Sequence, residues 1–199
     1  LCLCAGSVFA GPQSEEHLAD SVRIAMSSAV ADLPPPTPYL PTAQDQAAYE
    51  KWYRHTQAQL ERKLKDKKGQ LRLPELASPE LQQAFLQTVW YESRRAALDP
   101  TLVMGLIEVE SGFRKFAISS AGARGVMQVM PFWLKEIGRP QDNLMDIRTN
   151  LRMGCTILRY YLDMEKGDYI PALARYNGSL GKPDYPRKVI GRWTRVWMP

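Results

Sequence analysis

One stretch of this chain constrains its fold more than any other, the apolar segment DPTLVMGLIEVESG that begins at Asp99. Asp99 can cap the free amides of a helix, Pro100 suits the first helical position, and Gly112 can end the helix. At about 100° per residue, one face of this helix carries Val103, Leu106 and Ile107. Glu110 falls within the same apolar stripe, whereas Glu108 points away from it. The pattern therefore predicts a helix with one acid aimed inward.

Glu110 is the candidate for chemistry in this stretch. A carboxyl group on a buried face loses the hydration that favours its charged form, so its pKa rises unless a cation compensates. A general acid that works near neutral pH needs such a raised pKa. Helix geometry leaves a second interpretation open, because Glu110 lies in the last turn, where its side chain can extend into solvent.

The composition is that of a folded protein with a basic balance of charge. Hydrophobic residues make up 45% of the 199 residues and charged residues 24%, which suits one domain and a short additional element. The net charge of +5 suits an anionic polymer such as nucleic acid, acidic lipid or bacterial cell wall. Nucleic-acid binding through the C-terminal arginines has no motif behind it, so we expect no nucleic-acid partner.

Residues 1–10 are typical of the end of a signal peptide, because the apolar run closes on a small-residue cleavage pattern. A short hydrophobic strand is the alternative. Removal of this segment would leave Cys155 as the one cysteine, so we expect neither a disulfide framework nor a cysteine zinc site. A lipid anchor on Cys4 would normally need a smaller residue than Leu3 before it. No other apolar run reaches about 18 residues, so we expect an exported or periplasmic protein without an integral membrane segment, with outer-membrane association left open.

Two helices separated by a proline-rich linker are predicted before the central stretch. Residues 14–32 and 44–68 carry apolar positions at helical spacing. Five prolines between residues 34 and 41 favour an extended spacer, with a docking site for a proline-reading partner as the alternative. The predicted divisions are a signal remnant (1–10), a first helix and linker (11–42), an amphipathic pre-domain helix (43–78) and the main domain (79–199).

The main domain is predicted to be helical throughout. Ser78 and Pro79 begin a helix that runs to about Leu98. Further helices are expected at 132–138, 146–166, 169–177 and 185–197. Residues 123–130 are the one candidate for a small β-hairpin. The predicted fold class is therefore mainly α, with at most one hairpin, preceded by an extra N-terminal helical region.

Three short motifs follow one another in this domain. They are Glu110-Ser111 at a helix end, GVMQ at 125–128 after a glycine-rich turn, and ARYN at 174–177 at the end of a later helix. In this order and spacing they resemble the lytic transglycosylases of the soluble, Slt-like family, which typically read ES, then GLMQ followed by MP, then AYN. The likeness extends over roughly residues 98–193 and includes the turn NLRMG. It implies a lysozyme-like helical domain of the goose type that acts on the glycan strands of peptidoglycan.

The resemblance implies a specific role for Glu110. Glu110 matches the family's single catalytic acid, which protonates the oxygen of the β-1,4 bond between N-acetylmuramic acid and N-acetylglucosamine. The carboxylate then takes the proton of the sugar's own C6 hydroxyl as a 1,6-anhydro ring closes, so no second enzyme carboxylate is needed. Ser111 matches the next family position, where its hydroxyl can bond the substrate or steady the acid. Ordinary helix termination is the alternative for Ser111.

The same resemblance assigns five further residues to substrate binding. Gly125 permits a backbone close to the sugar, Gln128 offers a donor and an acceptor to an N-acetyl group, and Met127 offers an adaptable apolar wall. Tyr176 matches a tyrosine whose phenol faces the acid, and Asn177 matches a neighbouring polar contact. Structural interpretations also stand: core packing for Met127, a half-buried helix tyrosine for Tyr176 and a helix C-cap for Asn177.

Two rival functions remain beside this one. A hydrolytic muramidase of the same fold would need a second acid to hold a water, and Asp142, Asp146 and Asp168 are present without matching a catalytic motif. An inactive wall-binding or secretion scaffold is the other rival, against which the intact motifs argue. The chain also departs from the family pattern at Arg175, where alanine is usual, and this bears on subsites rather than on the reaction.

We expect no cofactor and no metal, because His17 and His55 lie far from the motifs and from each other in the sequence. Peptidoglycan glycan strands are the expected partner. A protein of the cell wall or of a secretion machinery is a candidate second partner.

Overall fold

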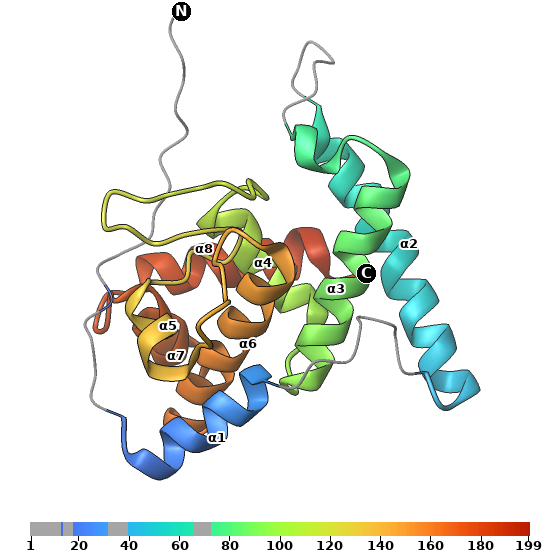
Figure 1. Cartoon of the computed structure of the whole chain (residues 1–199). Helices are drawn as coiled ribbons and strands as arrows, with labels where there is room; N and C mark the ends of the chain where they lie inside the picture. Colours follow the sequence, from blue (N-terminus) through green and yellow to red (C-terminus); the bar gives the residue numbers. More distant parts are fainter. Residues whose placement is uncertain (1–12, 14–17, 32–39, 66–72) are drawn as a thin grey trace, which may run out of the picture.

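The computed structural model describes residues 13, 18–31, 40–65 and 73–199, and these ranges are mainly helical (Figure 1). The elements in chain order are α1 (Asp20–Ala31), α2 (Ala43–Leu64), the 3-10 turn η1 (Pro74–Leu76), α3 (Pro79–Arg95), α4 (Pro100–Glu110), α5 (Phe132–Ile137), α6 (Ile147–Met164), α7 (Tyr169–Asn177), α8 (Asp184–Arg192) and the π-helical turn η2 (Trp193–Trp197). No β-strand occurs in the described ranges, which confirms the mainly α fold. The predicted signal remnant and most of the proline-rich linker lie outside them.

Helix α4 is the buried centre of the main domain. Its N-terminus is capped as predicted, because the Asp99 carboxylate accepts from the Thr101 amide at 2.8 Å and Pro100 fills the first helical position. All its residues except Glu108 and Val109 are buried, as expected for a helix that is apolar on every side. Helices α3 and α8 and the turn η2 pack against it, and α6 and α7 complete the ring between α3 and α8 (Figure 1). These helices therefore enclose one core.

The chain ends in a π-helical turn, not in the continuous helix over 185–197 that its periodicity predicts. The backbone of Trp193 approaches Gly105 so closely that a Cβ atom there would lie 2.8 Å from the Trp193 nitrogen. Both indoles of the turn reach α4, because Trp193 Nε1 donates to Thr101 Oγ1 and Trp197 Nε1 donates to Glu108 Oε2, each at 2.8 Å. Packing on α4 thus sets the shape of the last turn.

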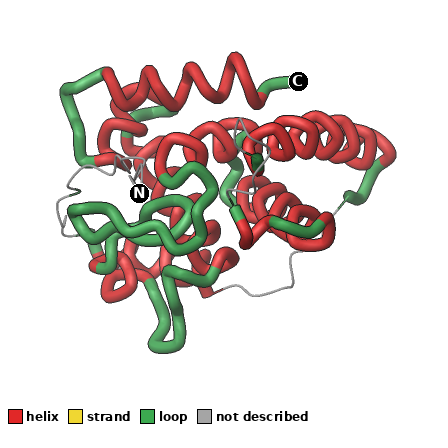
Figure 2. The backbone as a smooth tube through the Cα atoms, turned by 90° about the horizontal axis from the view of Figure 1, so that it is seen from above, coloured by secondary structure: helices red, strands yellow, loops and turns green. Residues whose placement is uncertain are grey.

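The segment between α4 and α5, residues 111–131, spreads over one end of the helices as a long loop (Figure 2). The predicted hairpin is reduced to two isolated bridges, Ile118 with Arg124 and Arg124 with Val129. Side-chain hydrogen bonds described below hold this loop in place of a sheet. Helix α3 also stops at Arg95, earlier than predicted, because Ala97 adopts a positive φ of 51°.

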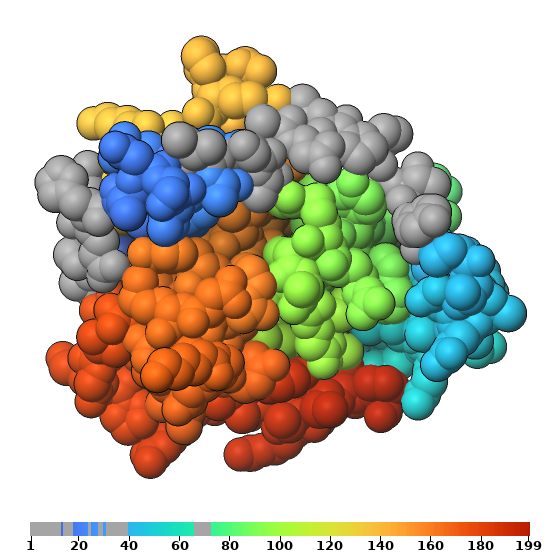
Figure 3. All heavy atoms as spheres, turned by 90° about the horizontal axis from the view of Figure 1, so that it is seen from below, coloured from blue at the N-terminus to red at the C-terminus, as the bar shows by residue number. Residues whose placement is uncertain are grey.

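The two N-terminal helices pack on the outside of this core. Helix α1 lies against α5 and α6 (Figure 3). Helix α2 runs beside α3 and reaches η2, where His55 Nε2 lies 3.2 Å from the Val196 carbonyl oxygen. Both helices are shorter than predicted, since α1 begins at Asp20 and α2 ends at Leu64, and part of each predicted range lies outside the described residues. No described helix is long and apolar enough to cross a bilayer.

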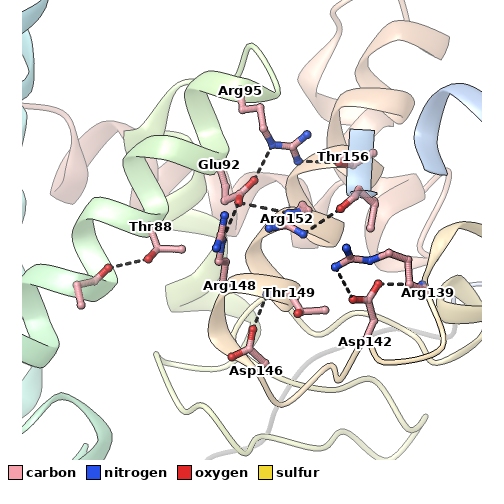
Figure 4. Close-up of polar contacts among 12 residues, drawn as sticks. Thr88, Glu92, Arg95, Arg139, Asp142, Asp146, Arg148, Thr149, Arg152 and Thr156 are labelled. Carbon is pink, nitrogen blue, oxygen red and sulfur yellow. Dashed lines mark hydrogen bonds and ion pairs between the residues drawn. The ribbon is translucent and has the colours of Figure 1, made fainter. Parts of the chain in front are cut away.

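A buried carboxylate joins α3 to α6 (Figure 4). Glu92 is 0% exposed, and its oxygens lie 2.7 Å from Arg95, 3.5 Å from Arg152 and 4.0 Å from Arg148. Arg152 is also buried, and it donates to the Val30 carbonyl of α1 at 2.9 Å. Burial lowers the pKa of the Arg152 guanidinium, and the Glu92 charge opposes that shift. Glu92 thus joins α3 to α6, and Arg152 extends this connection to α1.

Candidate active site

Glu110 is the last residue of α4 and is 1% exposed, so it lies inside the fold and does not extend into solvent. Burial raises the pKa of its carboxyl group from the usual 4.5 to about 8. No cation among the described residues contributes to this pKa. The group is therefore mostly protonated at neutral pH, which is the state that a general acid needs.

A tyrosine that the motifs did not indicate lies directly on this acid. The Tyr185 hydroxyl donates a hydrogen bond to Glu110 Oε1, and this bond lowers the Glu110 pKa against the larger effect of burial. Burial raises the pKa of Tyr185 well above its usual range, so the phenol remains a donor. The sequence contains one indication of this role. Tyr185 and Val189 are spaced so that both lie on the buried face of α8, and a buried phenol needs a hydrogen-bond partner.

The second oxygen of the acid makes no hydrogen bond within the described part of the chain. Glu110 Oε2 is buried and has no hydrogen-bond partner among the residues that the structure describes. Such atoms are uncommon in native structures, because an unsatisfied buried polar group costs free energy. Since Tyr185 occupies Oε1, a proton to be transferred belongs on Oε2.

Ser111 braces the junction between α4 and the loop that follows. Its hydroxyl donates to the Val126 carbonyl at 2.7 Å and accepts from the Phe113 amide at 3.1 Å. The bond to Val126 attaches the end of α4 to the GVMQ turn. The Ser111 hydroxyl is therefore hydrogen-bonded to the backbone, next to the end of the helix that carries Glu110.

The GVMQ turn is held by Asn150 from α6. The Asn150 side chain accepts from the Met127 amide at 2.8 Å and donates to the carbonyls of Arg124 and Leu144 at 2.8 and 3.0 Å. Gly125 has a φ of 78°, and a Cβ atom there would lie 2.4 Å from the Asn150 side chain. Glycine is thus required at this position by an internal contact. The sequence showed Asn150 as part of NLRMG without indicating this role.

Gln128 ends the same turn with a positive φ of 52°. Its side-chain nitrogen donates to the carbonyls of Ala117 at 3.0 Å and Gly125 at 2.8 Å. Its Oε1 is buried without a partner in the described part of the chain. The donor half of this amide is therefore used within the loop, and the acceptor half is the atom left for a ligand.

Tyr176 lies beneath the turn and supports it. Its hydroxyl donates to the Met127 carbonyl at 2.8 Å, whereas the phenol bonded to the acid is that of Tyr185. The Glu110 charge still raises the Tyr176 pKa, as a smaller effect than burial. The Met127 side chain is fully buried and fills the space beside Gly154, where a Cβ atom would lie 2.5 Å from its sulfur.

Asn177 is the last residue of α7 and is buried. The C-cap of this helix is the next residue, Gly178, in the left-handed conformation with a φ of 74°. The alternative prediction that Asn177 is the C-cap is therefore wrong, because Gly178 occupies that position.

The profile of the Transglycosylase SLT domain matches residues 88–188, which is just over half of the chain. The chain belongs to this family. The matched range of the SLT domain contains Glu110, the GVMQ turn, the ARYN motif and Tyr185. The family resemblance predicted from the three motifs is therefore confirmed.

Two curated relatives of the SLT domain are transglycosylases. The transglycosylase of Enterobacteria phage PRD1 is 36% identical over 113 residues, which cover 51% of this chain and 42% of the relative. The membrane-bound lytic murein transglycosylase C of Mannheimia succiniciproducens is 35% identical over 98 residues, which cover 45% of this chain and 26% of the relative. The chain thus spans less than half the length of either relative.

Among solved structures, an inactive mutant of the lytic transglycosylase Slt from Pseudomonas aeruginosa aligns with a TM-score of 0.44 and 22% sequence identity. The alignment covers 62% of this chain and 23% of that chain.

The three aspartates considered as a second acid have structural partners in this SLT domain. Asp142 pairs with Arg139 at 3.1 Å, Asp146 accepts from the Thr149 amide at 2.8 Å as the cap of α6, and Asp168 accepts from the Ile170 amide at 2.9 Å as the cap of α7. None of them contributes to the pKa of Glu110.

No group of three or more metal-ligating side chains occurs within the described ranges of the chain. Cys155 is buried in the SLT domain, and burial raises the pKa of its thiol, so it is a core residue and not a nucleophile. The chemistry that the described site offers is proton transfer by one buried carboxyl group.

Proposed function

We propose that this SLT-family chain is a lytic transglycosylase that cleaves the β-1,4 bond between N-acetylmuramic acid and N-acetylglucosamine and leaves a 1,6-anhydro end. The observation that carries the proposal is the burial of Glu110 with a pKa of about 8, which keeps the acid protonated at neutral pH. The names of both curated relatives support the reaction class. Glu110 is the proposed catalytic residue.

In the first step Glu110 acts as the general acid. The proton on Oε2 passes to the glycosidic oxygen as the bond to C1 breaks, and positive charge develops on the muramic ring. Tyr185 stays bonded to Oε1 and stabilises the carboxylate that forms, because a hydrogen bond to the charged form favours that form.

In the second step the same carboxylate acts as the base. The C6 hydroxyl of the muramic ring bonds to C1, and Glu110 takes its proton, so the acid is restored for the next cycle. No water enters the product, and no second carboxylate is needed. The structural partners of Asp142, Asp146 and Asp168 support this scheme over a hydrolytic muramidase.

The motifs predict that Ser111, Gly125, Met127, Gln128, Tyr176 and Asn177 bind the substrate. Among them Gln128 has an acceptor atom without a described partner, which suits the N–H of an N-acetyl group. Ser111, Gly125 and Tyr176 make internal contacts, so we assign them to positioning the GVMQ turn. Because Glu110 is nearly inaccessible, the groups that cover it must shift before a sugar reaches Oε2.

A peptidoglycan substrate places this reaction outside the cytoplasmic membrane. That location agrees with the signal remnant predicted at residues 1–10 and with a murein-acting relative. We therefore propose an exported or periplasmic enzyme.

Product analysis of digested sacculi tests the proposed reaction. The wild-type chain should release fragments with 1,6-anhydro ends, and Glu110→Gln should lower the rate by about 10²- to 10⁴-fold while the variant still unfolds cooperatively. Reducing ends in the wild-type digest would indicate a muramidase. Binding to sacculi without any cleavage by the wild type would indicate the scaffold, and an active Glu110→Gln variant would remove Glu110 from the mechanism.

A further inference from the structure

A cavity lies between α2 and α3, two helices that run side by side at the edge of the molecule (Figure 1). Its volume is about 450 Å³, within the range of roughly 300–1,000 Å³ that is typical of small-ligand sites. The lining residues are Tyr49, Glu50, Tyr53 and Arg54 from α2, and Gln83 and Gln87 from α3. None of them belongs to the catalytic motifs, so this cavity has no role in the proposed reaction step.

One wall of the cavity belongs to a fixed cluster of aromatic rings. The Tyr49 ring lies 5.8 Å from that of Tyr53, 6.2 Å from that of Trp52 and 5.2 Å from that of Trp90, measured between ring centroids. Trp52 and Trp90 are buried and lie 5.1 Å apart, so they anchor the half-buried Tyr49, and the half-buried Tyr53 packs on Tyr49. Rings held in this way present an apolar face to a ligand at little cost in side-chain entropy.

The other lining groups are polar, and their charges balance. Gln87 hydrogen-bonds to Tyr49, and Gln46 donates to Glu50 at 2.7 Å. Glu50 and Arg54 supply one negative and one positive charge, so the lining has no formal net charge although the whole chain carries +5. A cavity of this kind favours a neutral ligand that has both hydrogen-bonding groups and an apolar face.

We propose that this cavity binds an N-acetylated pyranose unit of a glycan strand, away from the bond that is cleaved. A pyranose ring has a C–H face that can pack on the phenol rings, and hydroxyl and amide groups that can bond to Gln83, Glu50 and Arg54. The inference rests on the proposed function, in which glycan strands are the substrate. A second weak site on the same polymer raises the overall affinity, because its binding becomes intramolecular once the first site is occupied.

The test uses the full chain with Glu110→Gln, so that sacculi are bound without being digested. Tyr53→Ala removes a lining ring, and Tyr169→Ala is the matched control. Tyr169 is 37% exposed on α7 and packs on Trp193 at 5.0 Å, much as Tyr53 packs on Tyr49. Sedimentation with sacculi should show an affinity about fivefold lower for Tyr53→Ala and unchanged for Tyr169→Ala.

Two further measurements separate loss of the ring from damage to the fold. Tyr53→Phe keeps the ring and should bind sacculi nearly as well as its parent. In the chain with intact Glu110, Tyr53→Ala should leave turnover of a soluble glycan fragment that is too short to occupy both sites unchanged, while turnover of sacculi at low concentration falls.

Equal binding by Tyr53→Ala and its parent would overturn the second site, and so would an equal loss in Tyr53→Ala and Tyr169→Ala. Neither result bears on the reaction at Glu110, whose failure would appear as missing 1,6-anhydro products. The two proposals can therefore fail separately.

Discussion

Glu92 and Glu110 are both buried acids of one domain, and they are accommodated in opposite ways. Glu92 on α3 has the guanidinium groups of Arg95, Arg148 and Arg152 within 4.0 Å (Figure 4). Glu110 at the end of α4 has a phenol on one oxygen and no described partner on the other. Cations balance the charge of the first acid, whereas a proton neutralises the second, whose pKa is about 8.

This difference separates a structural acid from a chemical one. Breaking a buried ion pair leaves an uncompensated charge in a medium of low dielectric constant, so Glu92 is suited to holding helices together. A neutral buried acid holds a proton that it can give to a bound oxygen near neutral pH, so Glu110 is suited to general acid catalysis. Burial alone does not distinguish the two roles, and the surrounding charges do.

The largest expected effect is on the pH dependence of stability. The pKa of Glu110 is raised to about 8 in the folded chain from a usual 4.5, so its stabilising contribution is fully present below pH 4.5 and is lost as pH rises through 8. The loss is on the order of 5 kcal/mol at about 1.4 kcal/mol per pKa unit. Urea unfolding across this range should show the wild type losing stability relative to Glu110→Gln as the pH rises. A pH-independent difference between the two would contradict the neutral buried acid.

Glu92→Gln should destabilise the fold at neutral pH. The substitution leaves the buried Arg152 without its counter-charge, and we expect the free energy of unfolding to fall by about 3–5 kcal/mol. The control is Asp163→Asn, which breaks a more exposed pair with Arg159 and should cost less than about 1 kcal/mol. Chemical denaturation measures both. Equal stability of Glu92→Gln and the wild type would mean that the cluster does not hold the helices.

Tyr185→Phe should have the smallest effect of the three. The lost hydrogen bond is one that lowers the Glu110 pKa, so the alkaline limb of the pH–rate profile should move to higher pH. The rate should fall about tenfold, because the carboxylate formed in the first step loses a hydrogen bond. Tyr176→Phe is the control, since its hydroxyl bonds to Met127. If the alkaline limb of the profile does not move in Tyr185→Phe, or moves equally in both variants, then Tyr185 does not set the pKa of Glu110.

Features that depend on one helix were predictable from the sequence. The Asp99 cap, Pro100 and the inward direction of Glu110 follow from local hydrogen bonding and from the rotation of a helix per residue. The three motifs also identified the family correctly, because they lie at helix ends and turns in a fixed order.

Features that depend on packing between distant segments were not predictable. Tyr185 lies 75 residues from Glu110 along the chain, and its contact exists because α8 packs on α4. Asn150 lies 23 residues from Met127, and only the fold shows that it holds the turn. The π-helical end at Trp193 has the same origin, since it depends on the close approach to Gly105. In each case the contacting residue lies in a distant segment, so the sequence pattern around one residue does not indicate the other.

Direct titration of Glu110 is the most decisive measurement. In protein labelled with carbon-13 at the glutamate carboxyl carbon, the resonance that disappears in Glu110→Gln should titrate with a midpoint near 8. A midpoint near the usual 4.5 would mean that Glu110 is charged at neutral pH, and it would contradict the buried general acid on which the proposed reaction depends.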